Sequence, residues 1–378
     1  MKQLIALALV LALVPMSGCG GSIYANYRPI EELVLIRTVG YDLEENGDVG
    51  LAVSSGKGGD ELPCVRLAAT GPSVGLAVEA VQDLATREEL YFPHTAYLLL
   101  GERAAGDAAR FLDYVERSVQ TRMDTPLIVV RHGTAAEAVT KAGGEESEVT
   151  EVLTSLRRDA ERSGTTRMFT LGETALSLAE SGAALCCAVK PITDPNTGTP
   201  TLKHDGFAVL REGRLVGWVE QSCARGVTLL LGQAVGTVTL PGGVTVELTD
   251  GGAELVPEWD GEGGLASLTV KLAVSAQVTE LKEAVKLSDN AQLERVGQEL
   301  AAAAERWVRG VLSVSRAARA DFMGLGRRLS VREPLKWEGC AEEWPALLEQ
   351  LPIRVSAEAE IVRVQDLRDS ANVSGGGK

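Results

Sequence analysis

Residues 268–278 read Leu-Thr-Val-Lys-Leu-Ala-Val-Ser-Ala-Gln-Val, and their apolar side chains at alternate positions predict a long β-strand that ends near Glu280. A helix is predicted next, with Ser288 or Asp289 as its N-cap. Its apolar residues recur at helical spacing and give it one apolar face: Leu293, Val296, Leu300, Ala304, Trp307, Val311 and Val314. Residues 353–361 alternate again and predict a closing strand. The C-terminal part is therefore predicted to be a sheet with a packed helix.

The N-terminal half of the chain shows the same mixture of patterns. Two apolar segments on either side of Asn46-Gly47 predict a β-hairpin. Further strands are predicted at about residues 64–69, 94–100 and 126–131, and helices at about residues 73–85 and 104–119. Strands and helices that alternate in this way predict a mixed α/β (α+β) protein.

Turn-forming residues mark two boundaries between domains. Residues 191–200 begin and end with proline and contain Asn196-Thr197-Gly198, which predicts a linker, and Glu262-Gly263-Gly264 predicts a second one. We therefore expect three domains, each a mixed or antiparallel β-sheet with packed helices. They are an N-terminal α/β domain at residues 30–190, a middle antiparallel β domain at 201–262 and a C-terminal α/β domain at 265–370, followed by a disordered tail at 371–378.

The first residues of the chain have the pattern of a lipoprotein signal peptide. Lys2 precedes an apolar segment at residues 4–14, and small residues lead to Cys19. That apolar segment is shorter than the about 20 residues that a membrane-spanning helix needs. We expect residues 1–18 to be removed, Cys19 to carry lipid, and residues 19–29 to form a tether. An ordinary secretory signal and a chance cysteine are the alternatives.

The charge of the chain excludes one class of partner. Residues 1–18 contain Lys2 and no acidic residue, so their removal changes the formal net charge from −15 to −16. A chain this acidic is repelled by phosphate backbones, so we do not expect nucleic-acid binding.

Candidate chemistry is sparse in this sequence. Gly71-Pro72-Ser73-Val74-Gly75 fits the G-x-S-x-G motif of hydrolases, but Ser73 also stands where a helix N-cap is expected, and we favour the cap. The three histidines, His94, His132 and His204, lack metal-ligand spacing, so no metal site is predicted. Five cysteines besides Cys19 form no disulfide framework and are predicted to be mostly buried. One bridge, Cys64–Cys340 or a similar pair, is left open.

Several segments, taken in order, resemble the Ger(x)C lipoproteins, the C subunits of bacterial spore germinant receptors. In the first half they are Cys19, Val39-Gly40-Tyr41-Asp42, Leu90-Tyr91-Phe92-Pro93-His94, and Leu112-Asp113-Tyr114-Val115 with Arg117 and Arg122. In the second half they are Gly206-Phe207-Ala208-Val209-Leu210, Arg214-Leu215-Val216-Gly217-Trp218, Thr279-Glu280, Asp321-Phe322-Met323-Gly324-Leu325-Gly326, Arg332-Glu333-Pro334-Leu335-Lys336-Trp337, and Trp344. The chain departs from the family pattern at Gly20-Gly21, where Trp-Asp is common.

The resemblance implies a role in spore germination. It implies a non-catalytic subunit that assembles with A-type and B-type integral membrane subunits on the outer surface of the inner spore membrane. Its lipid would be a diacylglycerol and an N-acyl chain on Cys19, with no other cofactor. The remaining signature residues are expected to be structural: His94, Arg117, Arg122, Gly217, Glu280, Asp321, Gly324, Gly326, Pro334 and Trp337. The alternatives are a solute-binding lipoprotein of a transporter and a cell-envelope hydrolase that uses Ser73.

Overall fold

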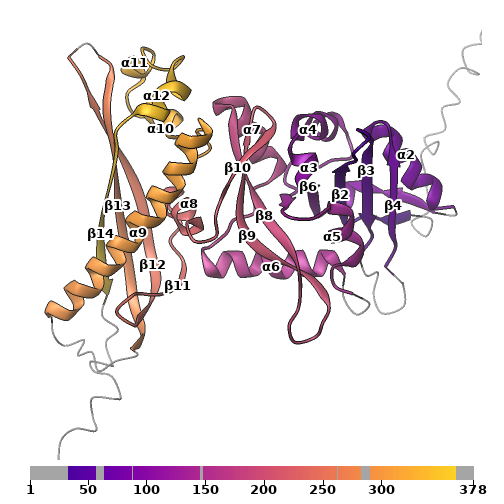
Figure 1. The fold of residues 1–378 in the computed structure, drawn as a ribbon, viewed down its shortest axis with the longest axis horizontal. Helices are drawn as coiled ribbons and strands as arrows, with labels where there is room; N and C mark the ends of the chain where they lie inside the picture. The colour runs from indigo at the N-terminus through magenta and orange to yellow at the C-terminus, as the bar shows by residue number, and fades with distance from the viewer. Residues whose placement is uncertain are drawn as a thin grey trace, which may run out of the picture.

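The computed structural model describes residues 33–56, 64–86, 88–144, 148–261, 263–281 and 290–362. Two β-sheets follow one another along the long axis of the molecule, and helices pack against both (Figure 1). The mixed α/β class predicted from the sequence is confirmed. The signal peptide, the tether and the C-terminal tail lie outside the described residues.

The larger sheet has eight strands in the order β10-β9-β8-β7-β6-β2-β3-β4. Its strands are β2 (Thr38–Leu43), β3 (Val49–Ser54), β4 (Arg66–Gly71), β6 (Tyr97–Gly101), β7 (Leu127–Val130), β8 (Ala183–Thr193), β9 (Pro200–Arg211) and β10 (Arg214–Val219). The central strands β2, β6, β7 and β8 are parallel, and antiparallel strands complete the sheet on either side. β1 (Leu33–Leu35) and β5 (Glu89–Tyr91) form a separate two-stranded parallel sheet. In the sequence, β1 comes directly before β2, and β5 comes shortly before β6.

Helices cover both faces of the larger sheet because its central strands are apolar on both sides. Leu98 and Leu100 face a core that includes α2 (Val74–Leu84), α3 (Glu102–Ala105) and α4 (Ala108–Arg117). Leu99 and Ile128 face the opposite core with α5 (Ala135–Lys141) and α6 (Val149–Ser163). Continuous apolar strands of this kind are typical of parallel sheets buried on both faces.

The smaller sheet has the order β11-β12-β13-β14. Its strands are β11 (Gly236–Thr239), β12 (Val244–Trp259), β13 (Leu265–Leu281) and β14 (Ile353–Val362), with β13 and β14 parallel. The predicted long strand, helix and closing strand are confirmed as β13, α9 (Asn290–Ala318) and β14. The proposed caps Ser288 and Asp289 lie outside the described residues.

Side chains cover the exposed edges of the smaller sheet. Along β14, the Glu305 carboxylate of α9 accepts from the Ala357 N–H at 3.1 Å, and Arg309 donates to the Val355 carbonyl at 3.1 Å. Along β12, arginines of α10 (Leu325–Arg332) donate to the carbonyls of Ala253 and Leu255. These contacts satisfy backbone groups that would otherwise offer a template for another strand.

A single hydrophobic core joins the two sheets. Phe207 and Val209 of β9 share this core with α8 (Ala224–Leu230), with α9 and with the apolar face of β13. Contact is close enough that a Cβ on Gly226 of α8 would lie 2.5 Å from the carbonyl oxygen of Trp307 in α9. The two halves of the molecule are thus packed together rather than tethered.

The linker conformation expected at residues 191–200 is not observed. These residues form the end of a β-hairpin, in which β8 and β9 pair from Ala183↔Arg211 to Thr193↔Pro200. The expected middle domain at 201–262 is therefore divided. Its strands β9 and β10 belong to the larger sheet, and β11 and β12 belong to the smaller one.

One local prediction also differs from the structure, and two segments depart from what their local sequence suggests. The helix expected at residues 104–119 is interrupted at Gly106-Asp107 into α3 and α4. Asp250-Gly251-Gly252, a sequence typical of turns, lies within β12, next to an irregularity in its pairing with β13. The largely polar residues between 143 and 171 contain α6, whose apolar stripe is narrow.

Candidate functional site

The signature segment Val39-Gly40-Tyr41-Asp42 holds the start of a helix. The buried Asp42 carboxylate accepts hydrogen bonds from the backbone N–H groups of Ala135 (2.8 Å) and Ala136 (2.7 Å), at the N-terminus of α5. A Cβ at Gly101 would overlap this carboxylate. Burial raises the pKa of Asp42, and the two backbone hydrogen bonds oppose that shift. This motif is structural.

The signature segment 321–326 contains a second buried aspartate whose carboxylate accepts hydrogen bonds from the N-terminus of a helix. Asp321 is 4% exposed. Its carboxylate accepts from the N–H groups of Leu325 (2.8 Å) and Gly326 (2.7 Å) at the start of α10, and from the Trp344 indole (2.8 Å). Burial raises the pKa of Asp321, and these donors oppose the shift. Asp321 therefore fixes the chain between α9, α10 and α12 (Trp344–Gln350).

Other signature residues complete the same corner. Gly324 has a φ of +62°, which favours glycine. A Cβ at Gly326 would lie 2.6 Å from Trp337 and 2.8 Å from Trp344, two rings that meet edge to face at 5.2 Å. Pro334 begins α11 (Pro334–Trp337), where its missing N–H costs nothing. The structure thus brings Asp321, Gly324, Gly326, Pro334 and Trp337 into one structural corner.

The remaining signature residues do not join them. His94 is exposed at the end of η3 (Phe92–His94) beside Tyr91, with ring centroids 5.7 Å apart. Arg117 and Arg122 are exposed and pair locally with Asp113 and Asp124. Gly217 lies in β10, and Glu280 lies exposed near the end of β13. Cys19 lies outside the described residues.

Two arrangements that could suggest catalysis have structural explanations. Ser73 is the N-cap of α2, as predicted: its hydroxyl accepts from the Leu76 N–H at 3.3 Å. Cys187 lies 3.6 Å from Nδ1 of His204, but burial raises the pKa of its thiol to about 11, the opposite of what a thiolate nucleophile needs. No disulfide joins any of the five cysteines that the structure describes: Cys64, Cys186, Cys187, Cys223 and Cys340. The Cys64–Cys340 bridge is therefore not formed.

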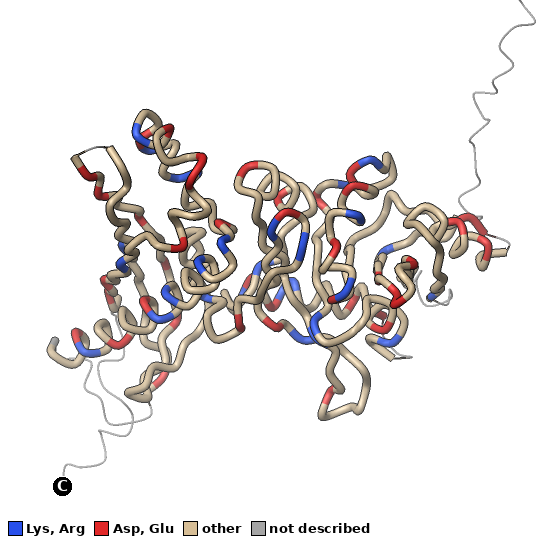
Figure 2. Tube along the Cα trace, turned by 45° about the horizontal axis from the view of Figure 1, so that its top comes forward, with Lys and Arg blue, Asp and Glu red and all other residues tan. Residues whose placement is uncertain are grey.

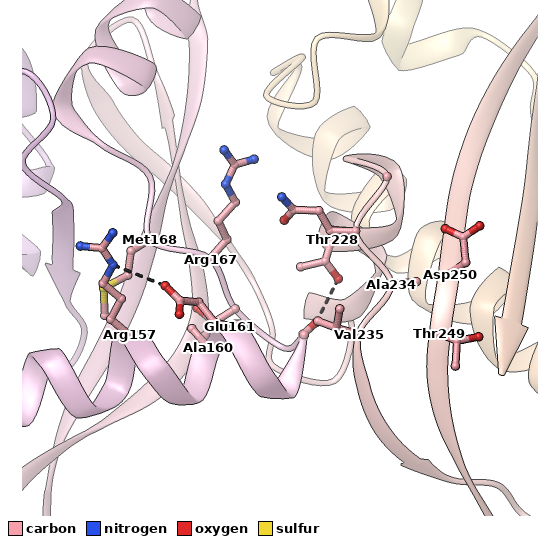
Figure 3. A pocket seen from close by; sticks show the side chains of 14 residues that line it. Arg157, Ala160, Glu161, Arg167, Met168, Thr228, Ala234, Val235, Thr249 and Asp250 are labelled. Carbon is pink, nitrogen blue, oxygen red and sulfur yellow. Dashed lines mark hydrogen bonds and ion pairs between the residues drawn. The ribbon is translucent and has the colours of Figure 1, made fainter. Parts of the chain in front are cut away.

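Two clefts lie where the halves of the molecule meet. The first, of about 550 Å³, lies between α6 and residues 232–235 (Figure 3). Arg157 pairs with Glu161, and Arg167 pairs with Glu173 while stacking on Phe169. The Asp250 carboxylate accepts from the Gly251 N–H at 2.8 Å. This cleft carries no evident recognition chemistry.

The second cleft, of about 620 Å³, separates α7 (Leu171–Ser181) from α10. Its apolar lining includes Leu176 of α7, Val331 of α10 and the signature residues Phe322 and Met323. Sequence reasoning missed this site because Leu176 and Val331 resemble ordinary core positions, and only the fold brings them to one groove.

Two family models match the chain in succession. The model described as "Spore germination protein N-terminal domain" matches residues 26–191, and "Spore germination B3/ GerAC like, C-terminal" matches residues 205–365. The chain belongs to the GerAC-like family of spore germination proteins. This confirms the family resemblance seen in the sequence.

A solved structure shares the fold of this GerAC-like protein. It is titled "Crystal Structure of the GerBC protein" and matches with a TM-score of 0.56 and 15% sequence identity, over 86% of this chain and 96% of that chain. Comparison with curated protein sequences gave no match. Among the described residues, none of the helices combines the length and apolarity needed to cross a membrane.

Proposed function

We propose that this GerAC-like protein is a non-catalytic, lipid-anchored subunit of a spore germinant receptor. It assembles with A-type and B-type integral membrane subunits on the outer surface of the inner spore membrane and supports the response to nutrients. The observation that carries the proposal is the match of two spore-germination family models, in order, over residues 26–191 and 205–365.

The surface charge of the folded part fits a protein-binding role better than nucleic-acid binding. Figure 2 shows Lys and Arg interspersed with Asp and Glu along both halves of the chain, whose net charge is −15. A phosphate backbone favours a strongly basic partner, whereas this chain is acidic overall.

The arrangement of the two halves speaks against the solute-binding alternative. Such a protein would close two similar lobes over its ligand, whereas here an eight-stranded and a four-stranded sheet differ in topology. The shared core between β9, α8 and α9 also opposes a hinge motion between the halves.

Cys19 is the proposed anchor, through a diacylglycerol thioether and an N-acyl chain. Two or more acyl chains give stable membrane attachment, whereas one gives marginal binding. Cys19→Ala should move the protein from the membrane fraction to the soluble fraction and lower receptor function, with the circular dichroism spectrum of its folded part unchanged. A Cys19→Ala protein that stays membrane-bound in spores with normal germination would contradict the anchor.

Assembly is tested by affinity purification of the tagged wild-type protein from detergent-solubilised spore membranes. The proposal predicts that A-type and B-type subunits co-purify in amounts comparable to the bait. Recovery of the bait without either subunit, under conditions in which an A–B pair stays intact, would contradict it.

A further inference from the structure

The parallel strands β2, β6 and β7 begin at one edge of the larger sheet. Hydrogen bonds join the segments that precede them: the Ala96 N–H donates to the Arg37 carbonyl at 2.7 Å, and the Thr125 hydroxyl donates to the Thr95 carbonyl at 3.3 Å. The described part of the chain starts at the same edge, because β1 leads directly into β2. This surface, named here the strand-start edge, comprises residues 33–37, 82–86, 88–96 and 118–126.

Helix α2 connects the strand-start edge with the opposite edge of the sheet. Near its C-terminal end, the Gln82 side chain accepts from the Leu90 N–H of β5 at 2.9 Å, and β5 pairs with β1. Just before its N-terminal end, the Pro72 carbonyl accepts from the Arg110 guanidinium at 2.9 Å, which also donates to Gly47 in the turn between β2 and β3 at 3.1 Å. The two ends of α2 therefore mark the two edges of the sheet.

Three large apolar side chains are exposed at the strand-start edge. Val119 is 100% exposed, Leu84 is 51% exposed and Met123 is 44% exposed. The segment that carries Val119 and Met123 is held in place, because the Gly172 N–H of α7 donates to the Met123 carbonyl at 2.8 Å. Exposed apolar side chains that gather at one surface mark a site of contact with a protein or a membrane.

The arginines of the same segment do not make this edge basic. Arg117 pairs with Asp113 at 2.8 Å, and Arg122 pairs with Asp124 at 2.6 Å. Glu88 is also exposed at this edge. The contact that the edge can offer is therefore apolar, and attraction to anionic head groups contributes little to it.

We propose that the strand-start edge is the surface that rests on the membrane, with Leu84, Val119 and Met123 in contact with lipid. The lipid anchor argues for this occupant. Cys19 stands 14 positions before Leu33, and an extended chain spans at most about 3.6 Å per residue, so the start of β1 lies within about 50 Å of the anchor. The chain enters the fold at the edge that exposes these side chains. The proposal rests on the proposed function and adds which surface faces the bilayer.

The anchor and the edge have different roles in this arrangement. The acyl chains on Cys19 supply the affinity, and once the protein is held at the membrane, weak apolar contacts suffice to orient it. Exposed apolar side chains enter the boundary between head groups and acyl chains to a depth of about 5–10 Å. Tyr91, half-buried at the same edge, is of a residue type enriched at membrane interfaces. A second copy of this chain fits the edge less well, because two molecules of net charge −15 repel each other.

The test measures which end of α2 approaches the lipid. Leu84→Trp and Val119→Trp place a tryptophan at the strand-start edge. Leu76→Trp is the matched control, because Leu76 is 47% exposed on the same helix, near its opposite end. Each full-length lipidated variant is reconstituted into phosphatidylcholine vesicles with or without bromine on the acyl chains, since bromine quenches tryptophan fluorescence at short range. The wild type gives the signal of the five native tryptophans, which is subtracted.

The proposal predicts that bromine quenches the added tryptophan of Leu84→Trp and Val119→Trp about threefold more than that of Leu76→Trp, because positions 76 and 84 are about 12 Å apart along the helix. Equal quenching in the three variants, or stronger quenching in Leu76→Trp, would overturn the proposal while leaving the anchor intact, provided that the protein floats with the vesicles. Failure of the wild type to float with the vesicles would overturn both the anchor and the proposal.

A second measurement detects the rival occupant. The mass of the full-length wild type in detergent is measured by sedimentation and compared with that of Val119→Asp. The proposal predicts a monomer in both cases. A wild-type dimer that Val119→Asp dissociates would assign the strand-start edge to a second copy of the chain and overturn the proposal.

Discussion

Replacing Gly326 with alanine should destabilise the C-terminal half of the protein, because the added methyl group has nowhere to go. A Cβ there would lie 2.6 Å from Trp337 and 2.8 Å from the indole nitrogen of Trp344. Both atoms belong to rigid rings that already contact each other at a centroid distance of 5.2 Å. Overpacking of this kind typically costs about 1–3 kcal/mol. Alanine regains up to about 1 kcal/mol of helix propensity in α10, so we expect a net loss of about 1–2 kcal/mol.

Urea unfolding followed by tryptophan fluorescence measures this directly, since Trp337 and Trp344 report on the site. With an m-value of about 2 kcal/mol/M, the midpoint should fall by about 0.5–1 M. Gly217→Ala is the matched control, because a Cβ at Gly217 meets nothing within 4 Å, and its midpoint should stay near that of the wild type. A Gly326→Ala protein as stable as Gly217→Ala would refute the steric explanation of this signature glycine.

Three further predictions concern other structural residues. Ser73→Ala removes the hydroxyl that accepts from Leu76 and should cost about 1 kcal/mol in thermal unfolding, and a loss of esterase activity in this variant would instead revive the hydrolase alternative. Asp42→Asn replaces one of two carboxylate acceptors with an N–H group, which should cost about 1–3 kcal/mol in urea, and an unchanged midpoint would contradict its role as acceptor for the first N–H groups of α5. Burial lowers the pKa of His204 in the folded state below its ordinary value near 6.5. The neutral His204 side chain therefore contributes to folding stability above pH 6.5, and this stability is lost as the pH falls from 6.5 through the lowered folded-state pKa. The melting temperature of the wild type should therefore fall more between pH 7.5 and 5.5 than that of His204→Gln, and parallel curves would show that His204 does not titrate with unfolding.

The elements that could be predicted are those whose periodicity reflects burial on one face. The alternation around Leu272 and the helical spacing around Leu300 gave the correct order of β13 and α9, because each element buries one continuous face in the shared core. Ser73 could be assigned as a cap because a helix N-cap is recognised from local sequence alone.

The errors arose where local signals have two meanings. The proline and glycine residues between Pro191 and Pro200 suit an interdomain linker and a hairpin turn equally, and only strand pairing distinguishes them. Helix α6 was missed because its buried stripe is narrow, with Val149, Leu153 and Ala160 among charged residues.

The second cleft, between α7 and α10, could not be predicted from any single segment. Glu180 and Arg327, whose ion pair ties its walls together, are 147 positions apart in the sequence. Periodicity identifies which residues are buried, but it does not identify which exposed residues lie close together. The proximity of exposed residues depends on the tertiary packing of the two halves.

The measurement that tests the central claim most directly is nutrient-triggered germination of spores lacking this gene, with a non-nutrient trigger as the control. A germinant-receptor subunit predicts loss of the response to a subset of nutrients, a normal response to the control trigger, and recovery when the wild-type gene is returned. Unchanged germination on every nutrient, in a strain without other receptors of this kind, would contradict the account.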